Sequence, residues 1–159
     1  MINVDCGRLA AGGQWILAGA VSLARMATIE DVARLVAELP AMTAGERHGN
    51  LTWLVAGKAF AWDRPFSKAD IRRFGTTVPP DGPILAVRVA DLAEKDAVLA
   101  TSSAAFFTIP HFDGYAAVLI QLKNVKMPEL REAIVDAWLA CAPSALADAY
   151  LQHDRARGE

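Results

Sequence analysis

The spacing of hydrophobic and polar positions predicts a helix that begins after Thr28 and ends before Pro40. Apolar residues recur along it at intervals of three and four: Ile29, Val32, Leu35, Val36 and Leu39. Thr28 is a residue type that caps helix N-termini, and Asp31 lies three positions later, close to the spacing of a capping box. Because Pro40 cannot continue a helix, the element is bounded at both ends.

The next segment carries the signals of a hairpin. We expect a loop over residues 41–50, followed by short β-rich strands at residues 51–55 and 58–63. Ala56-Gly57 separates the two strands, and a two-residue link that contains Gly is typical of a tight β-turn. A long connection, residues 64–83, then leads to the next strand.

A helix, a strand and a second helix are predicted within and after this connection. Ser67 is a suitable N-cap for a short helix over residues 68–74, before the turn-rich residues 76–83. Alternate residues of 84–90 form two sets, one for each face of a strand, and this period of two predicts a strand. A helix of ten residues, 92–101, follows Asp91, another capping residue type.

The remainder predicts two strands and C-terminal helices. We expect a short strand at residues 106–109, a tight connection at 110–114, and a strongly apolar strand at 115–122. A helix then starts near Pro128, and a last short helix runs from Ser144 through Leu151, before a polar, frayed tail. The order α-β-β-β-α-β-β-α predicts the α+β class, with helices packed on one face of an antiparallel sheet.

Length and composition indicate a single domain. The 159 residues are 53% hydrophobic and 21% charged, a composition that fills a core. Residues 1–25 are expected to be an N-terminal extension, helical over residues 14–24. A weak signal peptide and an upstream start are the other interpretations. The apolar stretch within residues 1–25, about 16 residues long, is shorter than a membrane span. The domain is expected over residues 26–152, with a polar tail at 153–159.

Charge and cysteine usage narrow the classes of function. The formal net charge of −2 argues against a strong, nonspecific nucleic-acid binder. The mean conceals an uneven distribution, because residues 58–90 carry six basic and three acidic side chains, whereas residues 91–122 carry one lysine and four acids. Cys6 and Cys141 cannot form a disulfide framework, so the reducing cytoplasm is the simplest compartment. Cys141, on the apolar face of a helix, is expected to be a buried small hydrophobe.

Motifs of common enzymes are missing from the sequence. There is no phosphate-binding GxxxxGK[ST] loop, GxGxxG, GxSxG or HExxH, and no Cys/His spacing of a zinc site. We therefore predict no cofactor and no metal. Whether the chain is an enzyme stays uncertain, with a non-enzymatic domain favoured.

The excess of basic residues over 58–90 is the first candidate site. Its six side chains are candidate phosphate contacts: Lys58, Arg64, Lys68, Arg72, Arg73 and Arg88. Aromatic residues interleave with them, and this combination is typical of surfaces that contact phosphates and stack bases. The alternative interpretation is an ordinary solvated face.

The second candidate site is a ligand pocket in the link between two strands. His111, Asp113 and Tyr115 lie within five residues, and His111 and Asp113 have side chains that share protons or hold ligands. Trp62, on the hairpin, is a further candidate for its lining. The alternative is structural, because Asp113-Gly114 is a common turn pair and the aromatic residues then belong to the core.

Ordered sequence features resemble the MmcQ/YjbR family over about three quarters of the chain. They are, in order, VARLVAELPAMT, HGNLTWLVAGKAFAW, LAEKDAVLATSSAAFFTIP, HFDGYAAVLIQL and ELREAIVDAWLACAPSALADAY. The resemblance implies a compact α+β domain and a role in DNA binding through a double-wing motif, without a defined enzymatic activity. The chain differs from short members of the family in its longer connection at residues 64–83, and its slightly acidic charge is a second departure.

Two functions therefore remain as hypotheses. The first is a non-enzymatic DNA-binding domain that contacts phosphates through the basic residues of 58–90, with weak and salt-sensitive binding. The second is a domain that binds a small ligand or a protein near His111 and Tyr115. Neither involves a membrane, and the sequence leaves the oligomeric state open.

Overall fold

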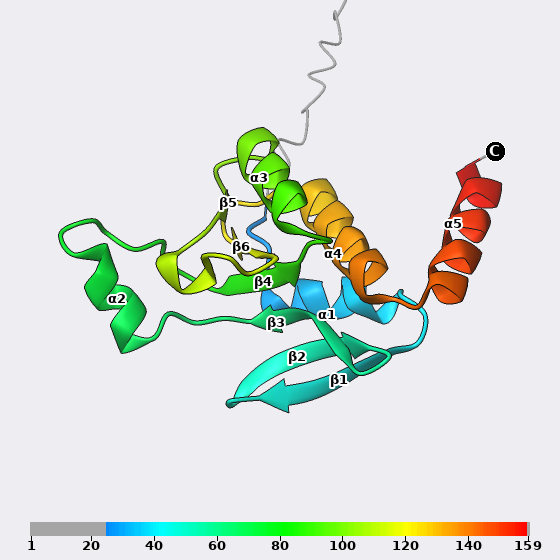
Figure 1. Ribbon diagram of the computed structural model, residues 1–159, viewed down its shortest axis with the longest axis horizontal. Helices are drawn as coiled ribbons and strands as arrows, with labels where there is room; N and C mark the ends of the chain where they lie inside the picture. Colours follow the sequence, from blue (N-terminus) through cyan, green and yellow to red (C-terminus); the bar gives the residue numbers. More distant parts are fainter. Residues whose placement is uncertain (1–24, 159) are drawn as a thin grey trace, which may run out of the picture.

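The computed structural model describes residues 25–158 and confirms the α+β class. Within these residues, six strands form one antiparallel sheet in the order β1-β2-β3-β4-β6-β5, and five α-helices and a short 3₁₀ helix surround it (Figure 1). The predicted N-terminal extension and its helix lie outside the described residues, apart from Arg25.

The first helix and the predicted hairpin lie where expected, although the helix ends three residues before Pro40 and the first strand of the hairpin begins one residue early. Helix α1, Ile29–Ala37, begins with a complete capping box in which the side chains and backbone of Thr28 and Asp31 exchange hydrogen bonds. Strands β2, Asn50–Val55, and β3, Lys58–Asp63, pair across the two-residue link that the sequence predicts.

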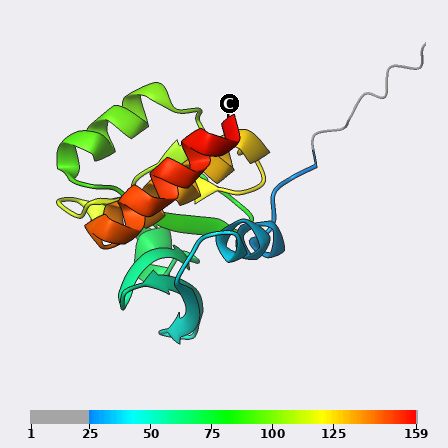
Figure 2. The same cartoon turned by 90° about the vertical axis from the view of Figure 1, so that its right-hand side faces the viewer.

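The expectation of a loop over residues 41–50 is wrong, because most of this segment forms strand β1, Met42–Arg47. This strand lies at the edge of the sheet and pairs in register with β2. None of its residues is fully buried, so the segment has no alternation of apolar and polar positions that would identify a strand. Figure 2 shows β1 and β2 curving away below the rest of the sheet, and the pairing of β2 with β3 shifts register between Trp53 and Leu54.

The middle of the chain follows the prediction closely. Helix α2, Lys68–Phe74, strand β4, Ile84–Arg88, and helix α3, Leu92–Thr101, lie where the capping residues and strand pattern place them. The strand expected at residues 106–109 is reduced to β5, Phe106–Phe107, and the connection after it contains the 3₁₀ helix η1, Pro110–Phe112.

The C-terminal part contains β6, Ala117–Gln121, and two helices of equal length. Helix α4, Met127–Cys141, packs on the sheet, whereas α5, Ser144–Gly158, stands beside the end of α4 (Figure 1). The expectation of a frayed tail from residue 152 is wrong, since α5 continues to Gly158. Polar composition therefore did not mark the end of this helix.

The sheet is buried on both faces at its centre, and two separate clusters of apolar residues result. Helices α1, α3 and α4 cover one face, where Trp138 and Leu85 are fully buried. The other face is covered by η1 and α2 with the segment between β3 and α2, which contribute Phe112, Phe74 and Phe66. The longer helices share one face as expected, and the second face has a thinner cover of aromatic side chains.

We expect Ala56→Asn to stabilise the protein by about 0.5–1 kcal/mol. Ala56 and Gly57 both have positive φ, 48° and 76°, as a type I′ hairpin turn requires. Alanine is disfavoured in this conformation because its Cβ crowds the backbone, whereas asparagine tolerates it. Urea denaturation checks the change in the free energy of unfolding.

His48→Asn is the matched control, because His48 has a φ of 52° in the equivalent turn between β1 and β2. Histidine already occurs more often than alanine in this region, so a smaller gain is expected there. A lower urea midpoint for Ala56→Asn than for the wild type would contradict the interpretation.

Candidate functional site

Helix α2 is held against the sheet by a buried carboxylate. Asp70 is almost fully buried and accepts hydrogen bonds from the backbone and hydroxyl of Ser67, which completes a capping box. The Arg64 guanidinium donates to the same carboxylate at 2.9 Å. Burial alone would raise the pKa of Asp70, but the hydrogen bonds from Ser67 and Arg64 outweigh it and hold the pKa below the ordinary 3.8.

This arrangement leaves a cationic surface on the outside of α2. Lys68, Arg72 and Arg73 are all exposed, and we call these three residues the α2 surface. The sole acid of the helix, Asp70, is turned inward, where Arg64 neutralises it and Arg73 approaches to 3.7 Å. Among the described residues, neither Lys68 nor Arg72 has an ion-pair partner.

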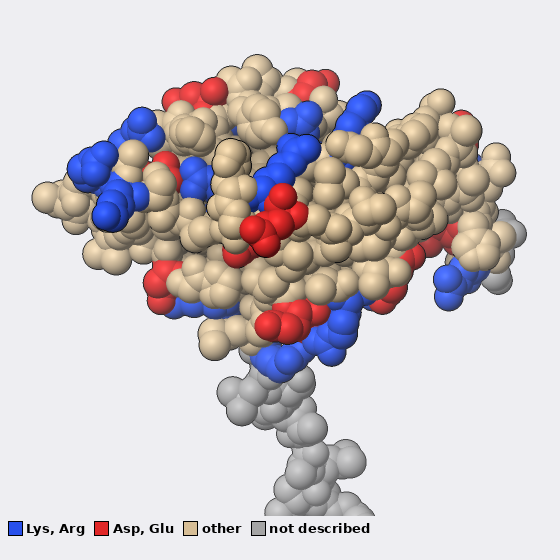
Figure 3. Space-filling model, turned by 90° about the horizontal axis from the view of Figure 1, so that it is seen from below, with Lys and Arg blue, Asp and Glu red and all other residues tan. Residues whose placement is uncertain are grey.

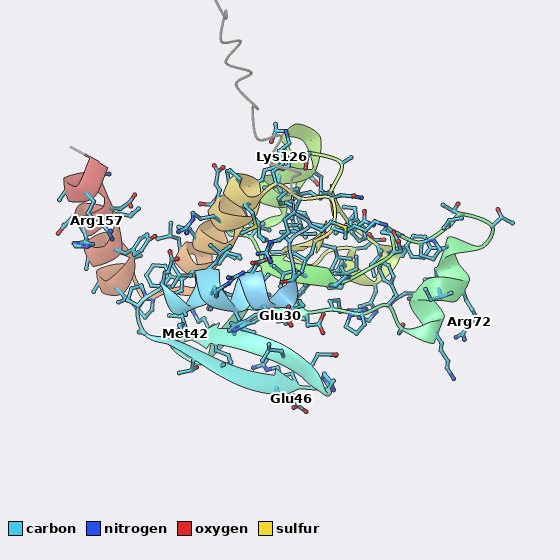
Figure 4. The ribbon with its side chains drawn as sticks, turned by 180° about the vertical axis from the view of Figure 1, so that it is seen from behind. Glu30, Met42, Glu46, Arg72, Lys126 and Arg157 are labelled. Atoms are coloured by element: carbon cyan, nitrogen blue, oxygen red, sulfur yellow. The ribbon has the colours of Figure 1, made fainter. Side chains whose placement is uncertain are left out.

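The α2 surface lies at one end of the molecule. Figure 4 shows the Arg72 side chain at the outer side of α2, pointing into solvent and away from the rest of the protein. Figure 3 shows Lys and Arg side chains gathered at the end that α2 forms, whereas elsewhere on this side of the molecule they alternate with acidic side chains.

The other predicted phosphate contacts do not join this surface. Lys58 begins β3, and α2 follows the opposite end of that strand, roughly 17 Å away by strand rise. Arg64 is mostly buried and engaged by Asp70 and by the Pro65 carbonyl oxygen. Arg88 lies half-buried at the end of β4. The basic residues of 58–90 therefore form no single face.

Arg64 and Arg88 instead lie against a group of aromatic side chains on the second face of the sheet. The Trp62 ring stacks on Phe112 with centroids 6.4 Å apart, and Tyr115 packs edge-on against both rings. Arg64 lies over the Phe112 ring at 5.6 Å, and Arg88 lies over the Tyr115 ring at 5.0 Å. We call these five residues the aromatic–arginine cluster.

A buried lysine fixes the chain segment that carries two of these rings. Lys95, on α3, is 5% exposed, and its ammonium donates to the carbonyl oxygens of Phe112 at 2.6 Å and Tyr115 at 3.0 Å. Burial lowers the pKa of Lys95 below its ordinary value, and the nearby carboxylates of Asp113 and Asp96 partly oppose this shift.

Sequence reasoning missed Lys95 as a buried residue. The spacing along α3 is the feature that indicates its burial, because Lys95 lies three and four residues before Val98 and Leu99, which pack against the core. The spacing places Lys95 on the inward side of α3. The acceptors that satisfy its ammonium come from a non-regular segment seventeen and twenty residues further on, which periodicity does not reveal.

The predicted pocket at residues 111–115 is only partly assembled. Tyr115 and Trp62 are in contact, but His111 and Asp113 are exposed and no hydrogen bond joins them in the described chain. The two best-formed cavities of the described residues hold about 30 Å³ each, enough for little more than water. Neither is lined by Trp62, His111, Asp113 or Tyr115.

Cys141 is a buried free thiol, as predicted. Its sulfur lies 3.8 Å from the Ala59 carbonyl oxygen, and burial raises the pKa of the thiol, which Arg88 and Lys58 partly oppose. A thiol with a raised pKa is a poor nucleophile at neutral pH. Residues 25–158 contain no cluster of three His, Cys, Asp or Glu side chains placed to hold a metal ion. No helix among them is long and apolar enough to cross a membrane.

The chain belongs to a family that includes shorter mycobacterial proteins. It is 43% identical over 129 residues to Uncharacterized protein Rv2570 of Mycobacterium tuberculosis, and the match covers 79% of this chain and 97% of that relative. Uncharacterized protein Mb2600 of Mycobacterium bovis matches with the same identity and coverage. No family model matches the chain. The names of these relatives state no activity.

We expect Asp70→Asn to lower the free energy of unfolding at neutral pH by about 2–3 kcal/mol. The substitution leaves Arg64, whose side chain is 15% exposed, without its carboxylate. Because the folded-state pKa of Asp70 is depressed, its stabilisation is fully present above 3.8 and is lost as the pH falls through the folded-state pKa. Urea denaturation at neutral and acidic pH checks both the size and the pH dependence.

Asp148→Asn provides the control, since Asp148 is exposed on α5 and a surface change of this kind has an effect within about 0.5 kcal/mol. The difference between the wild type and Asp70→Asn should shrink below pH 3.8. A constant difference across the pH range would show that Asp70 does not act through its charge.

We expect Lys95→Met to destabilise the protein by about 2 kcal/mol, because methionine fills a similar volume but leaves the carbonyl oxygens of Phe112 and Tyr115 without their donor. Near-ultraviolet circular dichroism should also change, since the segment carries ring contacts with Trp62. Lys126→Met, at an exposed lysine, is the control. A Lys95→Met protein as stable as the wild type would refute the anchoring role.

Proposed function

We propose that the protein is a non-enzymatic nucleic-acid-binding domain that contacts phosphates through the α2 surface. One observation carries the proposal: three exposed cations lie on a projecting helix whose only acid is buried and neutralised. Asp70 thus supports the helix without reducing the positive charge that solvent meets.

The chemistry of these side chains suits phosphate. Arginine presents a planar fork of donors that binds phosphate oxygens in pairs, and lysine adds a mobile point charge. Binding of such groups releases counterions from the nucleic acid, which makes the affinity strongly dependent on salt. With three cations and a net charge of −2, the domain is expected to bind weakly at physiological salt.

The proposal agrees with the DNA-binding role that the MmcQ/YjbR resemblance implies. We include membership of that family in the proposal. A cytoplasmic location, where nucleic acid is accessible, is also part of it. The α2 surface lies in the connection that is expected to be longer here than in short members of that family, so the phosphate contact is proposed for this chain and is not carried over from the resemblance.

The alternative, a small-ligand site at His111 and Asp113, has less support. A ligand site normally encloses most of its ligand, and neither of the two described cavities includes these side chains. His111 and Asp113 stay candidates for contacts at an open surface.

The test is a double charge reversal, Arg72→Glu with Arg73→Glu, measured by fluorescence anisotropy with labelled single-stranded and duplex oligonucleotides over a range of salt. We expect affinity at low salt to fall by about tenfold or more, and the slope of log K against log salt to decrease by about 0.7–0.9 for each lost contact. The reason is the loss of two phosphate partners on one helix.

A control of equal charge change is Lys126→Glu with Arg157→Glu, two exposed positions that Figure 4 shows far from Arg72. Nonspecific attraction to the whole protein would weaken equally in both double variants. The proposal requires the α2 variant to lose distinctly more affinity than the control, and wild-type protein that binds neither oligonucleotide at low salt would end it.

A further inference from the structure

We propose that the aromatic–arginine cluster is a platform on which unpaired bases stack, so that the ligand is single-stranded nucleic acid. The inference rests on the proposed function of the α2 surface and names the substrate class for it. It draws on Trp62, Tyr115 and Arg88, which the α2 surface does not include.

A continuous series of contacts runs from the inward side of α2 to the rings of the cluster. Asp70 of α2 binds Arg64 at 2.9 Å, Arg64 lies over Phe112 at 5.6 Å, and Phe112 meets Tyr115 at 5.7 Å. Arg88 lies over the other end of the series, 5.0 Å from the Tyr115 centroid. Helix α2 also contacts η1, which carries Phe112, so the cluster lies beside the helix whose outer side bears the α2 surface.

The exposure of the rings fits a platform with a supporting layer. Tyr115 is 43% exposed although it packs against two other rings, and Trp62 is half-buried. Phe112 is 4% exposed and lies against Trp62 with an angle of 18° between the ring planes, so it backs the outer rings. Large exposed aromatic side chains held rigidly in this way lose little conformational entropy on binding.

The charge around the cluster is also suited to a polyanion. Arg88 has no ion-pair partner among the described residues, so the positive charge that lies over the Tyr115 ring is not paired with a carboxylate. The exposed acid of the same turn, Asp113, is offset by the ammonium of Lys95 beneath it, whose pKa it helps to raise.

The stacking geometry separates single strands from duplexes. In a duplex each base is stacked between its neighbours, so its ring faces are not available to a protein side chain, whereas unpaired bases offer both faces. A purely electrostatic surface prefers the duplex, because its charge density is higher. A preference for single strands would therefore come from the rings and not from the cations.

The experiment compares Tyr115→Ala, Tyr115→Leu and Tyr115→Phe for binding to an oligothymidylate and to a duplex of equal length at low salt. Tyr115→Ala and Tyr115→Leu should weaken single-strand binding by about tenfold, whereas Tyr115→Phe should retain it. Duplex binding should be unchanged in all three. Because Tyr115 is 43% exposed and Lys95 binds its backbone, the variants are expected to fold, and Tyr115→Leu retains apolar bulk if Tyr115→Ala proves unstable.

The outcomes separate this inference from the proposed function. Wild-type protein that binds duplex as tightly as single strands, or a Tyr115→Leu variant with unchanged single-strand affinity, would overturn the platform. In either case, binding that still depends on Arg72 and Arg73 would leave the α2 surface intact. Loss of single-strand selectivity in Tyr115→Leu, with a salt dependence equal to that of the wild type, is the result expected.

Discussion

The two-sided burial of strands β4 and β6 is the constraint on which the rest of the structure depends. Alternate residues of these strands, such as Leu85 and Ala86, belong to separate apolar clusters on opposite faces. One face is closed by the longer helices. The other has no long helix, so the chain closes it with η1, α2 and a group of aromatic rings. This second layer is thin, and for that reason its outer side chains, Tyr115 above all, are both structural and exposed.

The layer on the second face is thin and has no large apolar area, so polar contacts are needed to hold it in place. Two buried ionic groups supply these anchors. Asp70 ties α2 to Arg64, and Lys95 ties the segment after β5 to α3 through two carbonyl oxygens. Each anchor has its hydrogen bonds satisfied, which is the condition under which a buried charge is tolerated. The anchors also determine charge at the surface, because Asp70 is withdrawn from it and Lys95 balances Asp113.

The sequence predicts the parts of this fold whose causes are local. Helix α2 and its cap at Ser67 depend on side chains within a few residues, and both lie where expected. Strand β1 does not, since an edge strand with no fully buried residue lacks the alternation that identifies strands. For the site, counting charges along the sequence identified the cations but not the distance between them. That distance is large because the whole length of β3 lies between Lys58 and α2. The burial of Lys95 depends on acceptors distant in sequence, so no local pattern reveals them.

The division of the basic residues changes what a mildly acidic chain is able to bind. A single broad basic face would attract any polyanion, and the net charge of −2 argues against it. Under the proposed function, arginines divided between an exposed helix and an aromatic cluster would act instead through short-range contacts. Arg72 offers its donors freely, while Arg88 is already oriented by the Tyr115 ring. Under the proposed function, a ligand gains from both only if its phosphates and its bases are accessible at the same time, a condition that an unpaired strand would meet.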